Sequence, residues 1–170
     1  MSEYFEKAFA ETIGNEGGYV NDPADPGGET QWGISKRAYP DMNIVSLTIR
    51  DAKAIYFHDY WDKLNLENLN SYLIAAEIFD TAINTGRRTA IRIAQRALNY
   101  LGEDLTEDGL IGPVTIAALN KWSAKDERAL FVCLNGFQFM HYYSITQKRA
   151  KSKRFARGWT KRIQQYKEKG

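Results

Sequence analysis

Residues 15–35, NEGGYVNDPADPGGETQWGIS, differ in composition from the chain on either side of them. This segment holds five of the 13 glycines and two of the four prolines in the protein. Two Asp-Pro steps and a Pro-Gly-Gly run predict turns, because proline fixes φ at a value that turns use and glycine allows positive φ. Tyr19-Val20 before the turns and Thr30-Gln31-Trp32 after them predict a small β-hairpin near residues 19–34.

Helical periodicity accounts for most of the remaining chain. In residues 3–13, Phe5, Phe9 and Ile13 recur on one face, and Thr48 with Asp51 forms a capping-box pattern that opens a second helix. Further helices are predicted at about 71–85, 88–101, 113–122, 125–150 and 155–167. The sequence therefore predicts a mainly α fold that carries one small hairpin.

The composition predicts one soluble domain. The chain has 170 residues, of which 44% are hydrophobic and 26% charged, and no apolar run approaches the roughly 20 residues of a membrane span. The first residues show no secretory signal pattern, so we expect synthesis in the cytosol without automatic export. The single cysteine, Cys133, excludes an internal disulfide and is expected to be a small core residue.

Charge is distributed unevenly along the chain. Residues 147–170 contain ten Lys or Arg and one Glu, a net charge of +9, whereas the whole protein has a formal net charge of +2. Such a basic end predicts attraction to a polyanion, with a solvated helix face as the alternative, and no nucleic acid is expected as a partner. Its apolar residues, including Phe155 and Trp159, either form an exposed amphipathic helix or dock on the protein core.

Glu16 is a candidate general acid. If the first helix reaches residue 16, Glu16 follows Phe9 by seven residues and Ile13 by three, which places its carboxyl group on the apolar face. Partial burial and the negative end of the helix dipole would both raise its pKa. Asp25 lies in a polar turn segment where it should stay ionised, and such a contrast between two carboxyl groups suits glycosidic cleavage. Asp22 is the alternative second carboxylate, and turn formation alone also explains both aspartates.

A longer set of motifs resembles glycoside hydrolase family 108, the N-acetylmuramidases of bacteriophage endolysins and related bacterial proteins. The set begins with EGGYVNDPADPGGETQWGIS and continues with YFHDYW at 56–61 and FDTAINTG at 79–86. The later segments AQRALNYLG, DGLIGPVT and FARGW resemble the peptidoglycan-binding segment that follows in that family. The resemblance implies one lysozyme-like domain over residues 1–170, with catalytic motifs at about 8–92 and the binding segment at about 93–165.

The resemblance also implies roles for particular residues. The glutamate of the Glu-Gly-Gly-Tyr motif, here Glu16, corresponds to the catalytic acid. In the smaller phage lysozymes a glutamate, an aspartate and a threonine are separated by eight and then five residues. Glu16 and Asp25 keep the first spacing, but Thr30 follows after only four residues, which leaves the role of this threonine open.

Sugar binding requires aromatic faces and polar edges, and several residues are candidates for it. Asp80 and Asn84 are four residues apart and share one helix face. All six candidates can equally belong to the core or to local structure. The predicted substrate-binding residues are Tyr19, Trp32, Tyr60, Trp61, Asp80 and Asn84.

The predicted activity is cleavage of the β-1,4 bond between N-acetylmuramic acid and N-acetylglucosamine by a monomer that needs no cofactor. A lytic transglycosylase and a non-catalytic peptidoglycan-binding module are the alternatives. A zinc amidase is disfavoured, because His58 and His141 show no paired metal-binding motif; a zinc site that combines them with Cys133 or an Asp is the alternative. No nucleophile elbow, phosphate-binding loop or dinucleotide fingerprint occurs in the sequence.

Overall fold

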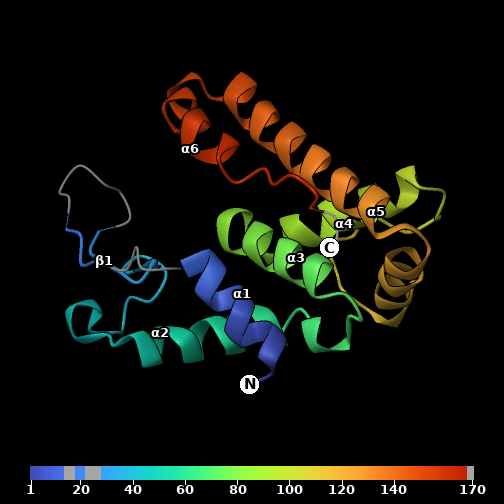
Figure 1. Ribbon diagram of the computed structural model, residues 1–170. Helices are drawn as coiled ribbons and strands as arrows, with labels where there is room; N and C mark the ends of the chain where they lie inside the picture. Colours follow the sequence, from blue (N-terminus) through green and yellow to red (C-terminus); the bar gives the residue numbers. More distant parts are fainter. Residues whose placement is uncertain (14–17, 22–27, 168–170) are drawn as a thin grey trace. The chain divides into compact units, whose positions relative to one another are not determined.

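The computed structural model of the protein describes residues 1–13, 18–21 and 28–167 (Figure 1). The chain forms two compact units, Met1–Lys63 and Leu64–Gly170. Helices supply most of the regular structure in both units, as predicted. The prediction that residues 1–170 form one domain stays a prediction.

The first unit contains short elements around two α-helices. Its elements are α1 (Glu3–Ile13), β1 (Thr30–Gln31), β2 (Ile34–Ser35), the 3₁₀ turn η1 (Ile44–Ser46), α2 (Ile49–Tyr56) and the π-helical turn η2 (Phe57–Asp62). The predicted capping box opens α2: the Thr48 N–H donates to Asp51 Oδ2 at 2.9 Å, and the Asp51 N–H donates to Thr48 Oγ1 at 3.3 Å. This reciprocal pair satisfies two backbone donors that a helix start otherwise leaves free.

Aromatic packing holds α1 against α2 and η2. Phe5 meets Phe57 and Trp61 edge to face, with ring centroids 5.0 and 5.6 Å apart, and Phe9 lies 5.9 Å from Tyr56. Phe5 is fully buried, and a side chain of this kind contributes about 1.5–3 kcal/mol when it leaves water. The periodicity of residues 3–13 thus identified the buried face of α1.

The predicted β-hairpin is present, with an additional pairing. Val20 and Thr30 form an antiparallel bridge with backbone hydrogen bonds of 2.9 and 2.8 Å, which confirms the predicted pairing of the two flanks. Beyond it, β1 turns tightly into β2, so that Thr30 pairs with Ser35 and Gln31 with Ile34. The sequence prediction placed Trp32 in a strand, whereas it lies in the turn between the strands.

The second unit is a helical assembly. Its elements are the 3₁₀ turn η3 (Leu66–Asn68), α3 (Tyr72–Thr85), α4 (Arg87–Tyr100), α5 (Pro113–Lys148), the 3₁₀ segment η4 (Ala150–Phe155) and α6 (Ala156–Thr160). The Ser71 hydroxyl accepts a hydrogen bond from the Ile74 N–H and caps α3, and Gly86 ends that helix with a φ of 85°. The predicted bounds of α3 and α4 are correct to within one residue.

The predicted separation of two helices at residues 122–125 corresponds to a break within α5. Asp126 has non-helical angles, φ −159° and ψ 83°, and its carboxylate accepts a hydrogen bond of 2.9 Å from the Ala129 N–H. Asp126 therefore caps the second half of α5. Across the described residues, no helix is both long and apolar enough to span a membrane.

Gln95 fixes the connection between α4 and α5. Its side-chain amide donates to Asp108 Oδ1 at 2.8 Å, and its carbonyl oxygen accepts from the Gly109 N–H at 2.9 Å. A Cβ atom at Gly109 would come within 2.6 Å of the Arg88 carbonyl oxygen, so this turn requires glycine. The motif DGLIGPVT thus has a structural role in this loop.

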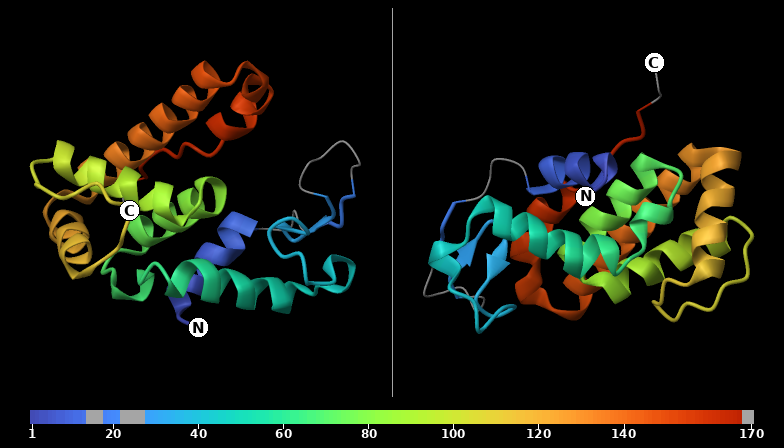
Figure 2. Two further views of the ribbon diagram at one scale, coloured as in Figure 1. Left: turned by 180° about the vertical axis from the view of Figure 1, so that it is seen from behind. Right: turned by 90° about the horizontal axis from the view of Figure 1, so that it is seen from below.

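The C-terminal prediction is partly wrong. The helix predicted at 155–167 ends at Thr160, and residues 163–167 run back along α5 as an extended segment (Figure 2). Contacts with α5 explain the difference: the Gln164 N–H donates to Asn135 Oδ1 at 2.7 Å, outside any helix. Trp159 stacks on Tyr142 at 5.1 Å. The apolar residues therefore dock on α5, except that Phe155 remains 47% exposed.

Candidate functional site

The predicted catalytic carboxyl groups, Glu16 and Asp25, and the alternative Asp22 lie outside the described residues. The structure instead defines what borders them in the sequence. Helix α1 is described as far as Ile13, and an antiparallel bridge pairs Val20 with Thr30, which flank the turn segment of residues 21–29. The roles of the three carboxyl groups stay predictions.

Thr30 lies where the bridge and β1 meet. Its backbone pairs with Val20 and its hydroxyl donates to the Gly28 carbonyl oxygen at 3.4 Å, so the side chain is directed back toward the turn segment. Close by, the exposed Tyr19 hydroxyl donates to Glu29 Oε2 at 3.4 Å. The sequence analysis did not single out Glu29, which is a further carboxyl group at this edge.

The turn after β1 positions Trp32. Both central residues, Trp32 and Gly33, have positive φ, 51° and 76°, as the type I′ hairpin turn requires. The indole N–H of Trp32 donates to the Leu47 carbonyl oxygen at 3.1 Å, and its own carbonyl oxygen accepts from the Tyr56 hydroxyl at 3.2 Å. Trp32 is thus held at both its ring and its backbone, and it is half-buried.

Tyr60 and Trp61 lie in η2 and differ in exposure. Trp61 is 0% exposed and packs on Phe5, as the core alternative requires. Tyr60 is half-buried, with its ring 5.7 Å from that of Tyr56. Of this pair, only Tyr60 has a surface that a sugar can reach in this structure.

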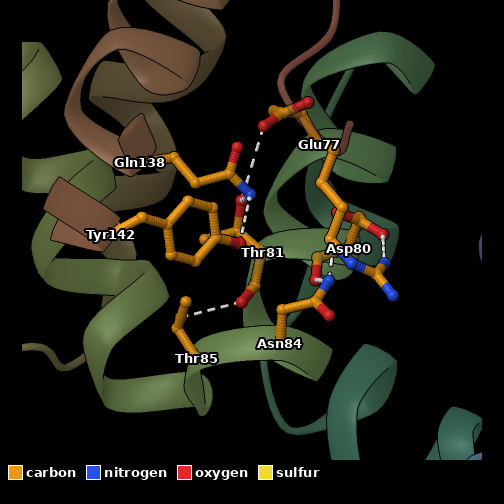
Figure 3. Close-up of polar contacts among 8 residues, drawn as sticks. Glu77, Asp80, Thr81, Asn84, Thr85, Gln138 and Tyr142 are labelled. Carbon is orange, nitrogen blue, oxygen red and sulfur yellow. Dashed lines mark hydrogen bonds and ion pairs between the residues drawn. The ribbon is translucent and has the colours of Figure 1, made fainter. Parts of the chain in front are cut away.

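Asp80 and Asn84 are brought together on α3, as their spacing predicts. The Asn84 amide donates to the Asp80 backbone carbonyl at 2.7 Å and to Asp80 Oδ2 at 3.2 Å. Figure 3 shows that Glu77 and Thr81 project from the same helix beside them, facing Gln138 of α5. These side chains form a polar stripe on α3, composed of Glu77, Asp80, Thr81 and Asn84.

Burial and mutual repulsion dominate the electrostatics of the polar stripe. Glu77 is 2% exposed, and burial with the nearby charge of Asp80 raises its pKa to about 8. Burial also raises the pKa of Asp80, against the opposing effect of Arg162, whose Nη1 donates to Asp80 Oδ1 at 3.2 Å. At neutral pH this arrangement favours a protonated Glu77 beside an Asp80 whose negative charge is compensated by Arg162.

Helix α5 supplies further polar groups to the stripe. Gln138 donates from Nε2 to Thr81 Oγ1 at 3.0 Å, and Thr81 in turn donates to Glu77 at 3.4 Å. Glu77 Oε2 and Gln138 Oε1 have no hydrogen-bond partner among the described residues. Both atoms are acceptors while Glu77 is ionised, whereas a protonated Glu77 carries an O–H donor. Burial raises the pKa of Tyr142, next to Gln138, to about 12.

The sequence analysis missed Glu77 and Arg162. Glu77 precedes Asp80 by three residues and Asn84 by seven, so helical spacing contained a signal for it. Arg162 is one of many basic residues near the C-terminus, and nothing in the local sequence distinguishes it. Its pairing with Asp80 joins residues 82 positions apart.

The histidines do not form a metal centre with each other in the part of the chain that is described. His58 contacts Asp59 at 3.1 Å, while burial lowers the pKa of His141. Within residues 1–13, 18–21 and 28–167, no group of three His, Cys, Asp or Glu side chains is arranged to hold a metal ion. Cys133 is half-buried, and burial raises the pKa of its thiol.

Comparison with known proteins shows two family matches along the chain. The glycosyl hydrolase 108 description matches residues 9–86, a segment that includes the end of α1, the hairpin, α2 and the whole polar stripe. Residues 9–86 are thus similar to glycosyl hydrolase family 108. The predicted peptidoglycan domain description matches residues 89–164, which hold α5, α6 and Arg162. These two matches support a glycoside hydrolase that acts on peptidoglycan.

A solved structure shares the fold of the chain. The structure of Brucella abortus SagA is 29% identical to the chain and aligns with a TM-score of 0.74, covering 94% of this chain and 88% of SagA. No curated protein sequence matches the chain. The predicted fold class, mainly α and lysozyme-like with a small β-hairpin, is confirmed.

The boundary between the two family segments does not coincide with the boundary between the two compact units. Helix α3 belongs to the family 108 segment, yet it lies in the second unit with α4 and α5. The polar stripe of the hydrolase segment is consequently completed by Gln138 and Arg162 from the peptidoglycan segment.

Proposed function

We propose that this protein is an N-acetylmuramidase, a lysozyme that cleaves the β-1,4 bond between N-acetylmuramic acid and N-acetylglucosamine. The observation that carries the proposal is the family 108 match over residues 9–86, which spans the Glu16 motif. The adjoining peptidoglycan segment supports a glycan strand of the cell wall as substrate.

In the proposed reaction, Glu16 donates a proton to the leaving glycosidic oxygen. Asp25, with Asp22 as the alternative, positions or activates the attacking water, and Thr30 assists it. Tyr19, Trp32 and Tyr60 offer aromatic surfaces to the sugar rings, while Asp80 and Asn84 offer polar edges. The hydroxyl of Thr30, directed toward the turn segment, supports its assignment to this group.

Replacement of the general acid tests the proposal. Glu16→Gln keeps the size of the side chain but removes its proton, so lysis of purified sacculi should fall at least about 100-fold. The circular dichroism spectrum of the variant should match that of the wild type, which shows that folding is intact. A variant that retains a tenth of the wild-type rate would contradict the assignment of Glu16.

The mass of the released muropeptides distinguishes the enzymatic alternatives in the same assay. Hydrolysis leaves a reducing muramic acid end, whereas a lytic transglycosylase leaves a 1,6-anhydro ring about 18 mass units lighter, because no water is added. Binding to sacculi without any released fragments would identify a non-catalytic module.

We further propose a biological role in lysis of a bacterial host by a phage or prophage, with holin-dependent release from the cytoplasm. The endolysin-like motifs in residues 16–35 support this role. The basic C-terminal segment would then favour contact with anionic wall or outer-membrane polymers, and the protein would act as a monomer.

A further inference from the structure

The polar stripe of α3 occupies positions that an ordinary helix gives to apolar side chains. Glu77, Thr81 and Asn84 follow one another at intervals of four and three residues, with Asp80 alongside. Exposure increases along the stripe from Glu77, at 2%, through Asp80, at 7%, to the half-buried Asn84. The Asp80–Asn84 pair therefore forms the solvent-facing end of an otherwise buried group.

The carboxylate of Asp80 is fixed by a donor on each oxygen. Arg162 Nη1 donates to Oδ1, and Asn84 Nδ2 donates to Oδ2, both at 3.2 Å. A carboxylate can accept about four hydrogen bonds, so acceptor capacity remains on both oxygens. Burial of a charged group is costly unless it is paired, and Arg162 supplies the opposite charge.

Contacts made by residues before and after Arg162 in the sequence hold its backbone in place. Before it, Trp159 stacks on Tyr142 with an interplanar angle of 15°. After it, the Gln164 N–H donates to Asn135 Oδ1 at 2.7 Å. These contacts anchor the segment around Arg162 on α5, so the guanidinium group meets Asp80 from a fixed backbone.

We propose that Arg162 is a positioning residue for substrate: it orients Asp80 so that this carboxylate and the Asn84 amide bind the hydroxyl or acetamido groups of a peptidoglycan sugar. Arg162 lies in the peptidoglycan segment and Asp80 in the hydrolase segment. One task of the peptidoglycan segment is then to complete a sugar-binding edge of the hydrolase. This inference rests on the proposed function.

The test combines single and double variants in kinetics and in binding. Arg162→Met should raise KM for soluble glycan fragments about tenfold or more, with a smaller change in kcat. The reason is that Asp80 loses the charged hydrogen bond from Arg162 that orients it for the sugar. Arg50→Met, which removes an exposed cation of α2 outside the basic C-terminal segment, is the matched control and should leave KM unchanged. Arg162→Lys keeps the charge and should restore part of the loss.

A double-variant cycle separates positioning from general stability. In an Asp80→Asn background, Arg162→Met should have little further effect on KM, because its partner no longer carries the charge. The inference is overturned if Arg162→Met leaves KM unchanged, if its effect is undiminished in that background, or if Arg50→Met has the same effect. Should Arg162→Met not fold, Arg162→Lys provides the same comparison.

Binding keeps this test separate from the proposed reaction. Calorimetric titration of Glu16→Gln with muropeptide-derived glycan fragments measures affinity without turnover, and adding Arg162→Met should weaken that affinity about tenfold. A wild-type protein that binds the fragments but does not cleave sacculi would refute the muramidase proposal. The effect of Arg162→Met on affinity would still be measured by the titration.

Discussion

Glu77 is a carboxyl group inside the protein, three residues before another carboxyl group on the same helix. Its folded-state pKa of about 8 lies above the ordinary value of 4.5, because burial and the charge of Asp80 disfavour ionisation. The folded protein therefore binds this proton more tightly than the unfolded chain does. The resulting stabilisation is complete below pH 4.5 and is lost as the pH rises through about 8.

Glu77→Gln should remove this pH dependence. Between pH 5 and pH 8, the free energy of unfolding of the wild type should fall by more than about 1 kcal/mol, since each unit of pKa shift corresponds to about 1.4 kcal/mol. The free energy of unfolding of the variant should fall by less over the same pH range. Urea unfolding of the second unit, followed by tryptophan fluorescence at both pH values, measures the difference. Asp104→Asn, at an exposed carboxyl group, is the control; equal slopes in all three proteins would contradict the argument.

Sequence information was sufficient for residues whose partners are local. The pairing of Asp80 with Asn84 followed from a spacing of four, and the capping box at Thr48 followed from a spacing of three. Arg162 could not be found in this way, because its contact with Asp80 depends on how the chain returns along α5. Arg162 lies among other basic residues, so nothing in the local sequence distinguishes it as the partner of Asp80.

At the scale of elements, tertiary contacts decided where prediction failed. The spacing of Phe155, Trp159, Ile163 and Tyr166 suits a helix, yet α6 ends at Thr160. The Asn135 side chain accepts the Gln164 N–H, and Tyr166 packs on Phe131 with ring centroids 5.9 Å apart. Hydrogen bonds and aromatic contacts with α5 thus replace those of a continued helix, which a local pattern does not reveal.

The hairpin between β1 and β2 has a turn that requires glycine. At Gly33 the φ of 76° is strained for other residues, and an added Cβ atom would lie 2.5 Å from the Tyr56 hydroxyl oxygen. Gly33→Ala should therefore destabilise the first unit by about 1–3 kcal/mol and lower lytic activity by displacing Trp32. Urea unfolding and the sacculus assay measure the two effects.

Gly28→Ala is the matched control for the hairpin. Gly28 also has a positive φ, 68°, but its added Cβ atom would lie 3.7 Å from the nearest side-chain atom, an ordinary contact. Its destabilisation should be the smaller of the two, because it lacks the clash. Equal effects would show that backbone strain alone, without the contact to Tyr56, makes Gly33 necessary.

At the scale of the whole molecule, charge is concentrated at one end of the sequence. Residues 148–167 contain nine Lys or Arg and no Asp or Glu. Most of these cations are exposed on η4, on α6 and next to them, whereas Arg162 is half-buried against Asp80. Docking of Trp159 and Tyr166 on α5 holds the segment in place while its charges face solvent. Such a surface should attract anionic polymers of the bacterial envelope.

Removal of four of these charges should weaken the attraction. A variant with Lys148, Arg149, Lys151 and Lys153 replaced by Gln should bind sacculi and outer-membrane vesicles less tightly at low salt. Its affinity should approach that of the wild type as salt rises, because exposed charges are screened over roughly 8 Å at physiological ionic strength. Co-sedimentation across a salt series measures both trends.

A control variant distinguishes the position of the charges from their number. Replacing the exposed cations Lys7, Arg37, Arg50 and Arg87 by Gln changes the net charge by the same amount but leaves the basic segment intact. This control should retain most of the wild-type binding, since the field near a surface depends on nearby charges more than on distant ones. If both variants lose affinity equally, net charge and not the C-terminal segment governs binding to the envelope. If neither loses affinity at low salt, the basic segment has no electrostatic role in binding.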